Sequence, residues 1–177
     1  MTRDRSFATT LMALAQACAD RPVGSVPVTR IHHRGDHLEL KRPGAEPVRV
    51  LCVHELRAAK EQIRGELGWR WAGTDLLALG DAPPWAHGLG WEVYLYDIGN
   101  YWWLVQDLRD ERGEGVQVES LWQEAGAFHA RLRSGRGVTS ASRPLDGTGF
   151  TGALALEMAL DHLRELPRQR GDDPGRN

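Results

Sequence analysis

The chain has few residues that crosslink a protein or bind a metal through sulfur, since it contains only two cysteines, Cys18 and Cys52. Each lies in an apolar run, Cys18 in a helix-like segment and Cys52 in a strand-like one. Both are expected to be buried small side chains rather than disulfide partners or metal ligands. The sequence therefore predicts no metal and no cofactor, and it favours a reducing, cytoplasmic location.

The chain also lacks a strong net charge and a long apolar run. Its formal net charge is −2 at pH 7, so overall charge predicts no polyanionic partner. No stretch reaches the length of about 18 apolar residues that a membrane span needs. Met1–Arg5 is charged and Phe7–Ala19 is apolar, which is similar to a secretory signal. The helical spacing of Phe7, Leu11 and Leu14 favours an amphipathic first helix instead.

Helix and strand patterns follow one another in the first part of the chain. Helices are expected at Ser6–Asp20 and Glu55–Leu67, because apolar residues recur there at every third or fourth position. Three strands are expected between them at Val26–His33, His37–Arg42 and Pro47–Val53, separated by turns that contain glycine. The sequence predicts a helix, a three-stranded meander and a second helix.

The second part of the chain begins with a stretch, Trp91–Arg109, that is rich in aromatic residues, which are typical of strands. Gly99-Asn100 divides one such stretch and suits a two-residue hairpin turn. Ser120 and Gln123 have the spacing of a capping box and predict the start of a helix. The expected elements are strands at Trp91–Ile98 and Tyr101–Arg109, a short strand at Val116–Val118, a helix from Ser120 to Leu132, a loop at Ser134–Thr148 and a helix at Thr151–Leu166.

These elements define a fold class. The expected order α-β-β-β-α-β-β-(β)-α-α predicts an α+β fold. Its antiparallel sheet consists of the three-stranded meander and the aromatic hairpin, and helices cover the sheet. Residues 1–166 are expected to form a single domain, and residues 167–177 a disordered tail.

All three tyrosines of the chain lie in the predicted hairpin: Tyr94, Tyr96 and Tyr101. With a two-residue turn, strand alternation places them on one face together with Trp103. Such a face either packs beneath a helix or binds a ligand. The flanking carboxylates of Glu92 and Asp107 repel phosphate, so a peptide or a small molecule suits this face better than nucleic acid.

A second feature points to an enzyme. Glu39-Leu40-Lys41, on the second expected strand, resembles the E-x-K element of the PD-(D/E)xK nucleases. The resemblance implies Mg²⁺-dependent cleavage, in which Glu39 holds the metal ion and Lys41 steadies the attacking water or the phosphate. Asp36 is the nearest acid for the partner position, because Val26–His33 contains none. Residues 21–72 carry ten Arg or Lys against six Asp or Glu, which favours nucleic-acid binding even without cleavage.

Two hypotheses of function stay open. The order of elements resembles that of type III secretion chaperones, which implies a homodimer that binds a partner polypeptide. The first hypothesis is a non-enzymatic binding or adaptor module that docks a protein segment or a small ligand on the aromatic hairpin face. The second is a Mg²⁺-dependent nuclease or nucleic-acid-binding protein that uses the basic segment 21–72. No Ser/His/Asp or Cys/His arrangement is evident in the sequence.

Overall fold

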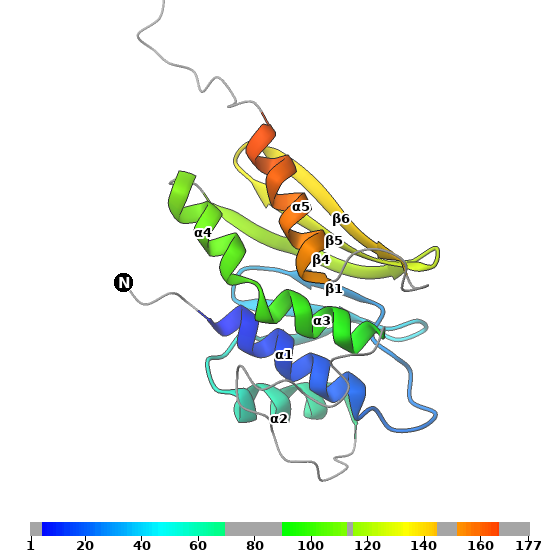
Figure 1. Cartoon of the computed structure of the whole chain (residues 1–177). Coiled ribbons are helices and arrows are strands. Elements are labelled where there is room, and N and C mark those ends of the chain that lie inside the picture. Colours follow the sequence, from blue (N-terminus) through cyan, green and yellow to red (C-terminus); the bar gives the residue numbers. More distant parts are fainter. Residues whose placement is uncertain (1–4, 70–89, 113–114, 145–151, 167–177) are drawn as a thin grey trace, which may run out of the picture.

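A six-stranded sheet is the centre of the computed structural model, which describes residues 5–69, 90–112, 115–144 and 152–166. The strand order is β3-β2-β1-β4-β5-β6, and every neighbouring pair is antiparallel. The described helices lie on one face of this sheet (Figure 1). The predicted α+β fold, with helices covering an antiparallel sheet, is confirmed. The predicted tail, residues 167–177, lies outside the described residues.

The elements follow the order α-β-β-β-α-α-α-β-β-β-α. They are α1 (Ser6–Ala19), β1 (Arg30–His33), β2 (His37–Lys41), β3 (Val48–Leu51), α2 (Leu56–Leu67), α3 (Trp91–Asn100), α4 (Trp103–Arg112), β4 (Val116–Glu124), β5 (Ala127–Ser134), β6 (Gly137–Pro144) and α5 (Gly152–Glu165).

The two halves of the molecule repeat one arrangement of elements. In each half a helical segment precedes a three-stranded meander, and another helix follows it. The meanders join through β1 and β4, where Ile31 lies opposite Leu121. On the helical face α1 packs against α3, so the first helices of the two halves also meet at the centre (Figure 1). The sequence contains no visible repeat, so this repeat is structural.

The elements predicted for the first half are confirmed, with small differences at their ends. Leu38, Leu40 and Val50 are fully buried beneath the helices, as strand alternation requires when one face is covered. The helix α2 ends at Gly68, whose φ of 69° is left-handed, a conformation that glycine adopts without strain. The strand β1 is shorter than predicted, since it begins at Arg30 rather than Val26.

The predicted aromatic hairpin is wrong, because residues 91–112 form the helices α3 and α4. The residues Trp91, Tyr94, Leu95 and Ile98 are all buried, and their spacing is that of one helical face. Tyr94 packs on Phe128 of β5, and Gly99 lies against Met12 of α1. This tertiary packing overrides the local strand preference of the aromatic and β-branched residues. Gly99 and Asn100 are the last residues of α3 rather than a hairpin turn.

The helix predicted from Ser120 to Leu132 is also wrong, because this segment contains β4 and β5. The two strands are joined at Ala125 and Gly126, which both have positive φ angles, as a two-residue hairpin turn requires. The expected strand at Val116–Val118 is the start of β4. The predicted loop after Ser134 contains β6, which pairs along the whole of β5.

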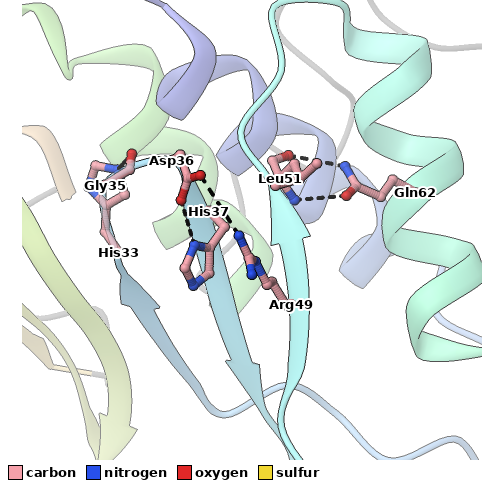
Figure 2. Close-up of polar contacts among 7 residues, drawn as sticks. All are labelled: His33, Gly35, Asp36, His37, Arg49, Leu51 and Gln62. Atoms are coloured by element: carbon pink, nitrogen blue, oxygen red, sulfur yellow. Dashed lines mark hydrogen bonds and ion pairs between the residues drawn. The ribbon is translucent and has the colours of Figure 1, made fainter.

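The outer edge of β3 is closed by a side chain from α2. The Leu51 N–H donates to Gln62 Oε1 at 2.8 Å, and Gln62 Nε2 donates to the Leu51 carbonyl oxygen at 3.1 Å (Figure 2). The amide thus makes the two bonds that a neighbouring strand would make. Because an unpaired edge can recruit another chain, this contact protects the sheet at Leu51.

Candidate functional site

The residues predicted to bind a ligand lie on two helices rather than on one sheet face. Tyr94 is fully buried, Tyr96 is 8% exposed, and Tyr101 and Asp107 are half-buried. Trp103 is 44% exposed, with its ring 6.5 Å from that of Tyr101. The remaining member, Glu92, is half-buried in the first turn of α3. The four rings do not share one sheet face, since Tyr94 and Tyr96 are part of the core and Trp103 is exposed. Ligand binding at these residues stays a prediction.

The residues of the nuclease hypothesis lie on β2 and on the turn before it. Lys41 Nζ is 3.6 Å from Glu39 Oε1, so these two side chains form an ion pair on the sheet face away from the helices. Asp36 stands at the turn, 2.7 Å from His37 Nδ1 and 3.8 Å from Arg49 (Figure 2). Within the described part of the chain, no group of three His, Cys, Asp or Glu side chains could hold a metal ion. A nuclease centre stays a prediction.

A cavity of about 650 Å³ lies where β1 ends, a size within the usual range of ligand pockets, about 300–1,000 Å³. It is bordered by the start of α1, the start of α4, the end of β1, the start of β4 and the end of β5. Aromatic and polar side chains line it together, among them Phe7, His33, Trp102, Gln106, Gln117 and Arg133.

The cavity exists because the two central strands differ in length. β1 pairs with β4 only from Ser120 to Trp122, whereas β4 already begins at Val116. The first residues of β4 pair with β5 on one side and border the cavity on the other. Among the described residues, no strand lies opposite Val116 in the place that a longer β1 would occupy. The cavity is therefore a gap in the sheet with a strand edge as its wall.

The direction of the backbone groups at this edge follows from one hydrogen bond. His33 Nδ1 lies 3.1 Å from the Val118 carbonyl oxygen, so the backbone of Val118 faces β1. In a strand, backbone groups two residues apart point to the same side. The N–H and carbonyl of Val116 therefore also face the cavity, where an extended chain could pair with them.

His33 closes the inner end of the gap. Its ring stacks on Phe7 with the centroids 4.4 Å apart. The Nε2 atom lies 3.1 Å from the Gly35 carbonyl oxygen, so both ring nitrogens face carbonyl acceptors. A neutral imidazole has one N–H, and only the protonated ring can donate to both. In either neutral tautomer, one ring N–H can therefore donate to a backbone carbonyl beside the strand edge.

The outer rim of the cavity carries an ion pair between β4 and β5. Arg133 donates from Nε to Glu119 Oε2 at 2.8 Å and from Nη2 to Glu119 Oε1 at 3.1 Å. This bidentate hydrogen bond lowers the pKa of Glu119 and raises the pKa of Arg133. The pair stays charged at neutral pH, so the rim is polar while the interior is aromatic.

Sequence reasoning missed this cavity because its walls come from five separate elements. One signal was present: the short alternation Val116–Val118 was identified as a strand. The residues after it were interpreted as a helix, so nothing indicated that this strand passes the end of β1. The position of Phe7 beside His33 depends on how α1 packs on the sheet, which one sequence does not specify.

Comparison with protein-family models, curated proteins and solved structures finds no match to this chain. Within the residues that the structure describes, no helix is long and apolar enough to cross a membrane. Neither Cys18 nor Cys52 forms a disulfide, and both are half-buried. The geometry of the chain is therefore the basis for proposing a function.

Proposed function

We propose that this protein is a peptide-binding module that adds an extended segment of a partner to the edge of β4 at Val116, beyond the point where His33 contacts the Val118 carbonyl oxygen. The observation that carries the proposal is the gap in the sheet, in which a strand edge borders a cavity of about 650 Å³. Unpaired strand edges are templates for another chain, and strand addition is a recurrent mode of peptide recognition.

The surroundings of the edge favour a peptide over a compact small molecule. The N–H and carbonyl of Val116 can form hydrogen bonds with the backbone of a peptide, whatever the sequence of that peptide. Alternate side chains of an added strand would point to opposite sides. One side meets the aromatic rings of Phe7 and Trp102, and the other meets Gln117 and Arg133. This combination provides affinity through the backbone and selectivity through the side chains.

A selection with a phage-displayed library of random peptides tests the proposal. Enriched peptides should bind the purified protein. Val116→Pro should weaken their binding by about tenfold or more. The loss of the hydrogen bond from the Val116 N–H and the clash of the proline ring with the peptide together cost more than about 1.4 kcal/mol. Proline is tolerated at the first residue of a strand, and the backbone of Val116 faces away from β5, so the β4–β5 ladder is kept.

The matched control is Val116→Ala, which removes two methyl groups of the side chain and keeps the N–H. It should bind the selected peptides within about threefold of the unmodified protein, as expected for a contact made by the backbone. Hydrogen exchange of the Val116 amide in the unmodified protein gives a second readout, since an added strand should slow it. Failure to enrich any peptide, or equal binding by the two variants without amide protection, would contradict the proposal.

A further inference from the structure

The sheet face opposite the helices is rich in arginine. Strand registers place five basic side chains on it, from β1, β2, β3 and β5: Arg30, Lys41, Arg49, Arg131 and Arg133. Three acids, Glu39, Glu119 and Glu124, share the face. Among the described residues no helix covers it (Figure 1). We name these side chains, together with Trp122, the arginine face.

Most charges of the arginine face are already paired. Lys41 pairs with Glu39 at 3.6 Å and Arg133 with Glu119 at 2.8 Å. Arg49 lies 3.8 Å from Asp36, and the carboxylate of Glu124 accepts a hydrogen bond from Trp122 Nε1 at 3.2 Å. Within the part of the chain that the structure describes, neither Arg30 nor Arg131 forms an ion pair with a carboxylate, although the charge of Arg131 acts on Glu119 at longer range.

The two remaining guanidinium groups are held by one ring. The guanidinium carbon of Arg30 is 5.3 Å from the Trp122 centroid, and that of Arg131 is 5.4 Å from it. His129 stacks on the same ring at 5.2 Å. Contact with an aromatic ring leaves the N–H groups at the edge of a guanidinium free to donate. The two groups are thus positioned in advance, which reduces the entropy lost on binding.

We propose that the arginine face binds an acidic polypeptide segment, whose carboxylates pair with Arg30 and Arg131. Arginine forms bidentate hydrogen bonds with carboxylates, and desolvated charge-assisted bonds are among the stronger polar contacts. The opposite charges of a Glu- or Asp-rich segment complement the two unpaired cations. The proposed site at Arg30 and Arg131 is distinct from the cavity at Val116, since neither of these arginines lines that cavity; Arg133, at the end of the arginine face, does.

Two observations favour an acidic polypeptide over single-stranded nucleic acid. Bases are held by stacking on exposed aromatic rings, whereas Trp122 is only 9% exposed and is covered by Arg30, Arg131 and His129. The three glutamates lie among the basic residues and would repel a continuous phosphate chain. Burial, and then the charge of Lys41, lowers the pKa of His32 on this face, which disfavours a positive charge on that side chain.

Fluorescence polarisation with labelled deca-glutamate, deca-lysine and deca-thymidylate tests the proposal. The unmodified full-length protein should bind deca-glutamate more tightly than the other two probes, and added salt should weaken the binding. Arg30→Gln and Arg131→Gln should each weaken it by about tenfold, as expected for a lost charge-assisted pair. Arg131→Lys keeps the charge and loses the planar fork, so it should also weaken binding by several fold.

The matched control is Arg57→Gln, which removes one exposed arginine from α2 on the helical side of the sheet. It should change deca-glutamate binding by less than about twofold. Equal losses in Arg57→Gln and Arg131→Gln would mean that only net charge matters and would overturn the proposal. So would tighter binding of deca-thymidylate, or no binding of deca-glutamate at about 1 mM.

Discussion

Gly99 of α3 lies against Met12 of α1 so closely that a Cβ at Gly99 would be 2.8 Å from Met12 Cγ. The same Cβ would lie 3.3 Å from the Ala8 carbonyl oxygen, which cannot move without bending α1. Gly99→Ala should therefore lower the free energy of unfolding by about 1–3 kcal/mol, as overpacking does. Urea denaturation followed by circular dichroism measures this change.

Gly65 provides the matched control, because it also lies within a helix and an added Cβ would meet nothing within 4 Å. Gly65→Ala should raise the free energy of unfolding by about 0.5–1 kcal/mol, since alanine loses less backbone freedom in a helix. Stabilisation of both variants to the same extent would mean that α1 and α3 do not approach as closely as the structure indicates.

The first half of the fold could be predicted because its signals are local. Gly35 and Gly68 have positive φ angles and mark a turn and a helix end, both positions that favour glycine. The alternation of Leu38 and Leu40 with polar neighbours matches a strand that is buried on one face. Each of these patterns spans a few residues, so no knowledge of distant packing was needed.

The second half could not be predicted, because distant packing and an irregularity decide it. α3 contains strand-favouring residues, and its close contact with α1 at Gly99 stabilises the helix instead. In β4 the register shifts between Val118 and Ser120, so the alternation of buried residues breaks there. Leu121 and Phe128 then lie at a spacing that also fits a helix. The cavity depends on this misinterpreted segment and was missed with it.

Tyr94 gives a second test of the core. Its hydroxyl is buried and has no hydrogen-bond partner among the residues that the structure describes. Burial raises the pKa of Tyr94, an effect that the charge of Arg143 opposes. Because the lone hydroxyl loses its hydration without compensation, Tyr94→Phe should leave the stability unchanged or raise it by about 1–2 kcal/mol in thermal or urea unfolding.

The ring of Tyr94 packs 5.3 Å from that of Phe128, so Tyr94→Ala should lower the free energy of unfolding by about 3–5 kcal/mol. A clear loss in Tyr94→Phe would reveal a partner for the hydroxyl, such as a bound water.

The chemical reactivity of Cys18 follows from its surroundings. Burial, and then the negative charge of Glu92, raises the pKa of the Cys18 thiol to about 12. The thiolate is the form of cysteine that reacts with iodoacetamide. In a Cys52→Ser variant, Cys18 is the one remaining thiol. At pH 8 it should react at least about a hundredfold more slowly in the folded protein than in the protein unfolded by urea. Mass spectrometry over time measures both rates. The rate should rise with pH as the thiolate fraction increases. Similar rates in the folded and unfolded states would show that the thiol is open to solvent.

The contact between Gln62 and Leu51 predicts how the molecule avoids self-association. Gln62→Leu keeps the size of the side chain and removes both hydrogen bonds to the edge of β3. Stability should fall by about 1–3 kcal/mol, since two bonds are lost and each contributes about 0.5–1.5 kcal/mol. The freed edge, next to an exposed Leu51 side chain, should pair with a second copy, so sedimentation velocity should detect dimers at high concentration.

Glu61→Leu is the control: it adds the same apolar side chain at the neighbouring exposed position of α2 and should leave the edge closed. If both variants dimerise to the same extent, added surface hydrophobicity and not the open edge is the cause.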